Sequence, residues 1–164
     1  MDSVIIPSKF SMHMDDIIKK YFSDAPTTTN YVDKNAFYAP ADLETISKVE
    51  QMLSIKFPSD YISFLLASNG FEGNLGQSYS RFIQLEQIQE YTKMYGGKFF
   101  PWIVFIGSDG GNEMYVLDKR GEKLQFGILP YVGDEDDFIP LGETFEEFVR
   151  HLYYNDFLQI KDSK

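Results

Sequence analysis

The sequence predicts an α+β fold, in which a helical pair and a C-terminal helix pack against a short, mainly antiparallel β-sheet. Two observations predict it. Segments with helical periodicity occupy the first part of the chain and its C-terminal end, and short apolar runs separated by turn residues lie between them. The 164 residues suit one domain, and a hydrophobic fraction of 43%, with 15 Phe and 11 Tyr, is enough for a substantial core.

The helical pair opens the main body of the chain. Residues 41–53 predict its first helix, because apolar side chains recur at helical spacing at Leu43, Ile46, Val49 and Leu53. Pro58 suits the start of the second helix, where its missing N–H costs nothing. The apolar face of that helix is expected to consist of Tyr61, Phe64, Leu65 and Leu66. Asn69-Gly70 suits its C-terminal cap, because both residues tolerate the left-handed conformation.

The segment before this pair is expected to hold a short first helix around 12–22. A linker rich in polar and turn-forming residues follows at 23–40, with room for a short strand. The domain is expected to span residues 1–164.

The sheet is expected in the second half of the chain. Residues 102–106 read WIVFI, and a continuous apolar run of this kind is typical of a central strand buried on both faces. A turn is expected at 118–121. Pro130 marks the end of a strand or an edge position. The other elements expected here are strands at 80–85, 112–118 and 122–132 and a helix at 86–97.

The last helix is expected over 143–154. Thr144 and Glu147 fit a capping box, in which each side chain accepts a hydrogen bond from the other residue's backbone N–H. The apolar face of this helix is expected to consist of Phe145, Phe148, Val149 and Leu152.

The formal net charge of −10 narrows the classes of partner. Nucleic acid and anionic membranes would repel such a chain, and a basic protein would attract it, although proteins without a charged partner are often acidic too. The chain has no cysteine, which excludes disulfides, zinc–thiolate sites and cysteine nucleophiles. No signal peptide is recognised, and no stretch approaches the ~18 apolar residues of a membrane span. A cytoplasmic protein is the simplest interpretation.

Catalytic and cofactor motifs do not emerge. The stretch GSDGGNE at 107–113 lacks the Lys-Ser/Thr pair of a phosphate loop and leads into a predicted strand, which favours a tight hairpin connection. Neither this stretch nor the acidic one at 133–143 has EF-hand spacing. His13 and His151 have no Ser or Asp at a recognised motif spacing. We therefore expect no enzymatic activity, no cofactor and no metal site, with a carboxylate–metal hydrolase as the less favoured alternative.

Carboxylates concentrate after the predicted sheet. Between 133 and 147, no Lys or Arg interrupts the acids Asp134, Glu135, Asp136, Asp137, Glu143, Glu146 and Glu147. The last two suit a helix N-terminus, whereas no local role is expected for the acids at 134–137. If these four fold near Asp109 and Glu113, the combined face would suit a basic protein. Asp109 could instead accept hydrogen bonds from backbone N–H groups of its own turn.

Three segments, in this order, resemble the Smi/Knr-type branch of the SUKH superfamily, which is named after a yeast cell-wall-synthesis regulator. The helix pair resembles that branch at Pro58, Tyr61, Phe64 and Leu65, and then at Asn69 and Gly70. The glycine–acid connection resembles it at Gly107, Asp109, Gly110, Gly111 and Glu113, and then at Tyr115 and Asp118. The closing helix resembles it at Phe145 and Phe148. The resemblance covers a core at about 40–152 and leaves the N-terminal helix and linker at 1–39 outside it.

The resemblance implies a protein that binds another protein. Bacterial members are mostly immunity proteins, which block a cognate toxin domain, often a nuclease, in the cytoplasm without a catalytic apparatus or cofactor. Eukaryotic members resemble scaffolds for signalling partners. The expected function is therefore occlusion of a toxin's active site by a monomer or weak homodimer, and the alternative is a regulatory scaffold that binds an endogenous protein. The partner-binding residues expected are Asp109, Glu113, Asp134, Glu135, Asp136 and Asp137.

Overall fold

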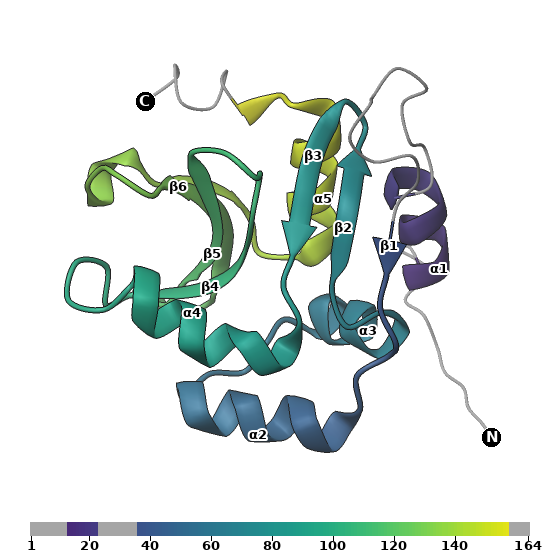
Figure 1. The fold of residues 1–164 in the computed structure, drawn as a ribbon, viewed down its shortest axis with the longest axis horizontal. Helices are drawn as coiled ribbons and strands as arrows, with labels where there is room; N and C mark the ends of the chain where they lie inside the picture. The colour runs from purple at the N-terminus through teal and green to yellow at the C-terminus, as the bar shows by residue number, and fades with distance from the viewer. Residues whose placement is uncertain (1–12, 23–35, 158–164) are drawn as a thin grey trace.

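The β-sheet of the described residues contains seven strands, which follow one another in chain order (Figure 1). The computed structural model describes residues 13–22 and 36–157. Each strand pairs antiparallel with the next. The strands are β1 (Ala36–Phe37), β2 (Phe71–Leu75), β3 (Ser78–Phe82), β4 (Ile103–Ser108), β5 (Glu113–Asp118), β6 (Gln125–Pro130) and β7 (Ile139–Gly142). The predicted α+β class with an antiparallel sheet is confirmed.

Helices precede, interrupt and follow the sheet. The helical elements are α1 (Met14–Ile17), η1 (Ile18–Phe22), α2 (Leu43–Leu53), α3 (Ser59–Ala67), η2 (Leu85–Gln87), α4 (Ile88–Tyr95), η3 (Glu135–Asp137) and α5 (Phe145–Tyr154). Here η1 is a π-helical turn that continues α1, and η2 and η3 are 3₁₀ turns. Among the described residues, no helix is both long and apolar enough to cross a membrane.

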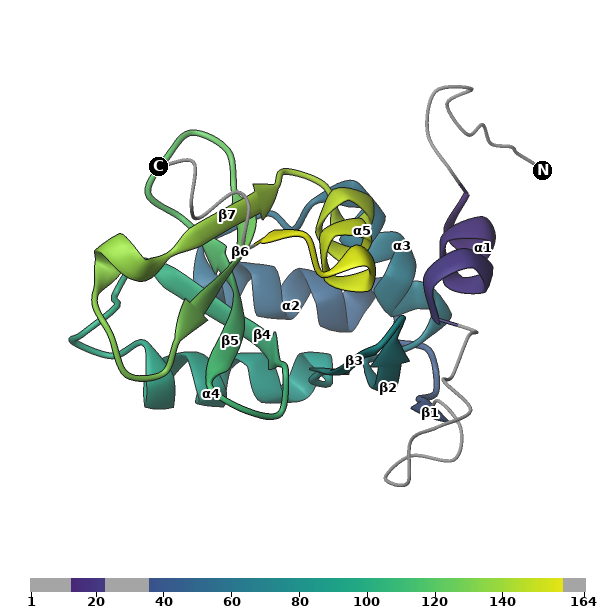
Figure 2. The same cartoon turned by 90° about the horizontal axis from the view of Figure 1, so that it is seen from above.

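Helices α4 and α5 cover opposite faces of the sheet, as Figure 2 shows. Phe105 of β4 is paired with Val116 of β5, so the neighbouring Tyr115 points to the other face. The Phe105 ring packs against Tyr95 of α4, with the ring centroids 5.1 Å apart. The Tyr115 ring packs against Phe148 of α5 at 5.3 Å. Strand β4 is therefore buried on both faces, as its apolar run predicts.

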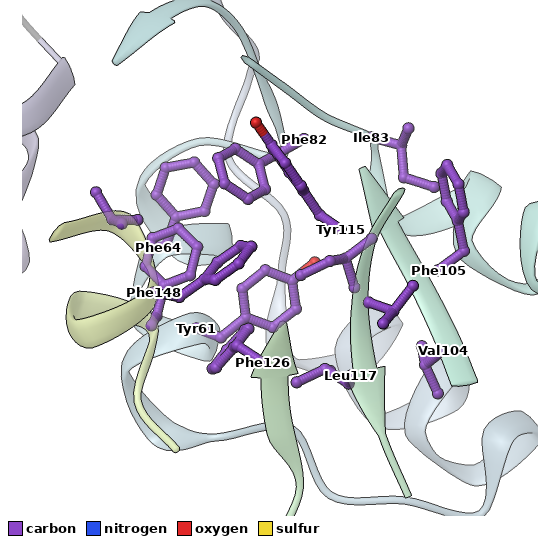
Figure 3. Close-up of a cluster of buried hydrophobic side chains, with 14 of the residues drawn as sticks. Tyr61, Phe64, Phe82, Ile83, Val104, Phe105, Tyr115, Leu117, Phe126 and Phe148 are labelled. Atoms are coloured by element: carbon purple, nitrogen blue, oxygen red, sulfur yellow. The ribbon is translucent and has the colours of Figure 1, made fainter. Parts of the chain in front are cut away.

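Aromatic rings fill the layer between the sheet and helices α3 and α5 (Figure 3). Phe126 of β6 stacks on Phe148 of α5 with the centroids 5.3 Å apart. Phe145, also of α5, lies 4.7 Å from the ring of Phe64 in α3. Phe22 of η1 stacks on Phe64 at 5.4 Å, which places the N-terminal helical turn in the same core. Edge and offset contacts of this kind each add about 0.5–1.5 kcal/mol to the burial of apolar area.

The N-terminus of α5 is capped from two directions. The predicted capping box is confirmed, because Glu147 N donates to Thr144 Oγ1 at 3.1 Å and Thr144 N donates to Glu147 Oε1 at 3.1 Å. A second cap comes from α3, where the Asp60 carboxylate accepts from Phe145 N at 2.8 Å and from Glu146 N at 3.0 Å. Asp60 therefore links the helical pair to the last helix, a role that the sequence does not indicate.

We expect Asp60→Ala to lower the free energy of unfolding by about 2 kcal/mol, because two backbone N–H groups at a helix N-terminus lose a charged acceptor. Asp60→Asn keeps one acceptor oxygen and is expected to lose less. Urea unfolding followed by the fluorescence of Trp102, the single tryptophan, measures both variants. Equal stability of Asp60→Ala and the wild type would show that this cap does not stabilise the fold.

The predicted apolar faces of the helical pair need two corrections. Leu43 and Leu66 were expected to be buried, but they are 64% and 38% exposed. Leu43 is the first residue of α2, and the buried positions of that helix begin only at Ile46. Leu66 follows the buried Leu65, and each residue of a helix is rotated by about 100° from the one before it, which turns Leu66 outward.

The predicted cap of α3 at Asn69-Gly70 is wrong. The helix ends at Ala67, and its C-cap is Ser68, which is extended and donates its N–H to Phe64 O at 2.7 Å. Asn69 instead binds the start of η2, because its Oδ1 accepts a hydrogen bond from Leu85 N at 2.8 Å. Gly70, at φ +112°, allows a close approach of two backbones, since a Cβ there would lie 2.7 Å from Phe82 O.

The sheet also departs from the prediction in strands β1, β2 and β7. The sequence does not predict β2 or β7, because FEGNL and IPLG contain glycine, proline and polar residues. Both strands form because they pair with a neighbour. Strand β2 pairs with β3 along its full length, and β7 pairs with β6. The strand predicted at 80–85 is β3, and the one predicted at 122–132 is β6, which ends at Pro130 but is not an edge strand. Strand β1 lies in the predicted linker, whose residues 23–35 are outside the described part of the chain.

Candidate functional site

The glycine-rich stretch at 108–113 is a hairpin connection that Asp109 holds in shape. One carboxylate oxygen of Asp109 accepts from Gly111 N at 2.8 Å and from Glu113 N at 3.2 Å. Gly110 adopts φ +79°, a conformation that glycine reaches without strain. The prediction that Asp109 binds backbone groups of its own turn is confirmed, and β5 follows the turn where a phosphate loop would require a helix.

We expect Asp109→Ala to lower the free energy of unfolding by about 1 kcal/mol, because it removes the acceptor of two backbone N–H groups in an exposed turn. Asp109→Asn keeps the amide oxygen as an acceptor and is expected to stay close to the wild type. Thermal unfolding of the two variants separates the structural role of Asp109 from its charge. A loss that is equal in both variants would assign the effect to the charge.

A hollow of about 170 Å³ lies beside this turn, and Tyr79, Asp109, Glu113 and Tyr115 line part of its wall. The Tyr79 hydroxyl donates to the Glu72 carboxylate at 2.5 Å. Partial burial, with this hydrogen bond as the second cause, raises the pKa of Tyr79 to about 12. Tyr115 shares a hydrogen bond of 2.7 Å with Ser80. The polar groups next to the Asp109 turn thus have partners within the sheet.

Residues 134–137, here called the acidic turn, form a 3₁₀ turn that closes on itself. Asp134 is its N-cap, and its carboxylate accepts from Asp136 N at 2.9 Å. The Asp137 carboxylate accepts from Asp134 N at 2.9 Å. The expectation that these acids have no local role is therefore wrong for Asp134 and Asp137. Glu135 and Asp136 make no such bonds to the turn, and all of the acids except Asp137 are exposed.

Arg120 ties the acidic turn to the sheet. Its guanidinium carbon lies 3.6 Å from the centroid of the Trp102 ring, within cation–π range. Its Nε and Nη2 each donate to the Asp118 carboxylate at 3.0 Å, and its Nη1 donates to Glu135 at 3.2 Å. Hydrogen bonding to Asp118 raises the pKa of Arg120, so the charge is permanent. The apolar run at 102–106 predicts a core position for Trp102, but Trp102 is half-buried and its ring packs against the guanidinium of Arg120.

The structure groups the predicted acids in two places. Asp109 and Glu113 lie at the N-terminal end of β5. Arg120 lies just past the C-terminal end of β5, and it donates a hydrogen bond to Glu135. A strand of six residues is about 17 Å long. The connection that carries the acidic turn begins beside Glu113, because Glu113 is paired with Pro130 and Tyr131 N donates to Asn112 O at 3.0 Å. A single face shared by the acidic turn, Asp109 and Glu113 stays a prediction.

The two histidines and the acids are the side chains that could serve as catalytic or metal-binding groups. His151 Nδ1 lies 2.6 Å from Asp156 Oδ1 near the end of α5, a pair that the sequence reasoning does not anticipate. His13 is the N-cap of α1 and is exposed. Within residues 13–22 and 36–157, no group of three or more His, Asp or Glu side chains could hold a metal ion.

A larger hollow, of about 940 Å³, lies where the α2–α3 connection meets the β5–β6 turn. Its wall carries charges of both signs, and Lys123 Nζ lies 3.8 Å from the Glu143 carboxylate. Asp60, on the same wall, is occupied by the N-terminus of α5. This balanced hollow offers no preference for a charged ligand, whereas the acidic turn does.

The comparisons with known proteins agree with the sequence resemblance. Residues 40–151 match the model of the SMI1 / KNR4 family (SUKH-1), a range that begins just before α2 and ends within α5. The chain is also 34% identical over 118 residues to a protein of Bacillus subtilis (strain 168) named "Uncharacterized protein YnaB", and the alignment covers 67% of this chain and 74% of YnaB. The chain therefore belongs to the SMI1 / KNR4 family (SUKH-1).

Proposed function

We propose that the protein is an immunity protein, which binds a cognate secreted toxin domain of basic charge and occludes its active site in the cytoplasm. Membership of the SMI1 / KNR4 family supports an immunity role or a regulatory role. It also supports the binding of a protein partner, without specifying which protein. The observation that carries the finer proposal is the exposed, preformed acidic turn on a chain of net charge −10. In this role the protein acts by binding and catalyses no reaction.

The acidic turn suits this role because its shape is fixed before a partner arrives. Asp134 and Asp137 close the turn, and Arg120 holds Glu135 against the sheet. A preformed surface loses little conformational entropy on binding. Its carboxylates would stand in for the phosphates that a nuclease binds, and their field would steer a basic partner toward it. Asp109 and Glu113 form a second acidic site, which we propose contacts the outer part of the same partner.

The test is affinity capture from a lysate of the source organism at low and at high salt, with the eluate identified by mass spectrometry. A basic toxin domain retained at low salt and released at high salt is the expected result. Retention of a housekeeping protein alone, with no toxin domain even when the toxin is expressed, would overturn the immunity assignment. That outcome would favour the regulatory scaffold instead.

A further inference from the structure

Two apolar side chains next to the acidic turn are unusually exposed. Val132 is 93% and Phe99 78% exposed, the highest values among the large apolar residues that the structure describes. Isolated exposed apolar residues are normal on a surface. These two are not isolated, because Val132 immediately precedes Gly133, and Gly133 and Phe99 line the same hollow. Figure 2 shows the α4–β4 and β6–β7 connections, which carry these residues, at the same end of the molecule.

The hollow, here called the aromatic hollow, measures about 440 Å³. One wall comes from the segment before β4 and carries Phe99, Phe100 and Trp102, and the other carries Asp134 and Glu135 of the acidic turn. The carboxylates would repel an anion, and a purely apolar group would cover them without adding to the bonds that Glu135 accepts from Arg120 and Asp134 accepts from Asp136 N. A side chain with an apolar stem and a cationic head satisfies both walls, because the stem packs on the rings and the head pairs with a carboxylate.

One guanidinium of the protein itself, that of Arg120, already contacts both an aromatic ring and a carboxylate. Arg120 lies over Trp102 at 3.6 Å and donates to Glu135 at 3.2 Å. Arg120 lines a neighbouring hollow, and Glu135 belongs to the walls of both. The aromatic hollow therefore offers a second position in which an aromatic ring and a carboxylate meet. A planar guanidinium fits such a position better than an ammonium, because it can stack on a ring and bond a carboxylate at the same time.

We propose that the aromatic hollow receives an arginine side chain of the protein partner, and that Phe99 and Val132 contact the apolar residues beside that arginine. The proposal rests on the proposed function and adds to it an aromatic wall, which together with Asp134 and Glu135 forms an anchor that the acidic residues alone do not supply. Central aromatic residues and buried arginines contribute most of the energy at protein interfaces, whereas rim charges mainly set the association rate.

The experiment is a titration of the ¹⁵N-labelled full chain with acetyl-Leu-Arg-Leu amide, followed by nuclear magnetic resonance. The matched probe is acetyl-Leu-citrulline-Leu amide, which keeps the shape of arginine and removes its charge. With the arginine peptide we expect saturable shifts of the backbone amides of Phe99, Phe100, Trp102 and residues 133–135, and of the Trp102 indole N–H. The citrulline peptide is expected to bind at least several-fold more weakly. Shifts elsewhere, or equal binding of both peptides, would overturn the proposal.

Two variants test the walls separately. Phe99→Ala and Asp134→Asn are each expected to weaken the arginine peptide at least several-fold, and the asparagine keeps the oxygen that caps the turn. Met94→Ala, which removes an exposed side chain of α4 that does not line the hollow, is expected to bind as the wild type does. Unchanged binding in Phe99→Ala would contradict the aromatic wall.

The proposed function and this inference can fail separately. If the captured toxin domain binds Phe99→Ala as tightly as the wild type, the hollow is not the anchor, while the immunity assignment stands. If the peptide binds in the hollow but only a housekeeping protein is captured, the hollow is an arginine site of a regulatory scaffold.

Discussion

Phe145→Ala is expected to lower the free energy of unfolding by about 3–5 kcal/mol, the usual loss when a buried phenylalanine is truncated. The Phe145 ring is fully buried and contacts the rings of Tyr61, Phe64, Phe82 and Phe126. Its removal opens a cavity where α3, α5 and the sheet meet. For a chain of this size the melting temperature should fall by about 10 °C. Calorimetry and urea unfolding measure both quantities.

Phe99→Ala is the matched control for this prediction. It removes the same side chain from a position that is 78% exposed, and surface substitutions of this kind usually change stability by less than about 0.5 kcal/mol. A loss in Phe145→Ala no larger than that of Phe99→Ala would contradict the packing of α5 against the aromatic layer. A large loss in both would place Phe99 in the core.

The second large effect concerns the rate of partner binding. A variant in which all four acids of the acidic turn become amides (Asp134→Asn, Glu135→Gln, Asp136→Asn and Asp137→Asn) keeps the oxygen acceptors of the turn. At low salt we expect its association with the captured basic partner to be at least about tenfold slower, because charged surfaces steer the encounter. The difference should shrink toward high salt, since the screening length falls to about 3 Å at 1 M. Surface plasmon resonance at several salt concentrations measures it.

The control variant carries the same change in net charge elsewhere: Asp15→Asn, Asp16→Asn, Glu44→Gln and Glu90→Gln. These acids are exposed, and they lie on α1, α2 and the first turn of α4 and not in the acidic turn. Glu44 pairs with the exposed Lys48, and such surface pairs contribute little to stability. If this variant slowed association as much as the amide variant, the effect would come from net charge and not from the acidic turn.

The parts of the fold that the sequence predicts are those with a local signal. The apolar run at 102–106 identifies the buried strand β4, and Thr144 with Glu147 identifies the start of α5. Strand β2 has no such signal, because its residues include Glu, Gly and Asn and its order comes from pairing with β3. The exposure of Leu43 follows from where α2 meets the core, which its periodicity does not reveal.

The candidate site shows the same division. The sequence identifies the acids and offers the structural role of Asp109, because an Asx turn is a local motif. It does not place Arg120 on Trp102 or next to Glu135, since those contacts join residues far apart in the chain. The capping role of Asp60 is missed for the same reason. The only advance signal for Arg120 was the Asp-x-Arg spacing within the turn after β5.

We propose that the protein silences a basic toxin domain through the acidic turn. The most direct test titrates the activity of the captured toxin domain with the wild type, the amide variant of residues 134–137 and the control variant at low salt. We expect stoichiometric inhibition by the wild type and the control variant, and inhibition by the amide variant only at much higher concentration. Full toxin activity in the presence of excess wild-type protein, or equal inhibition by all three proteins, would contradict it.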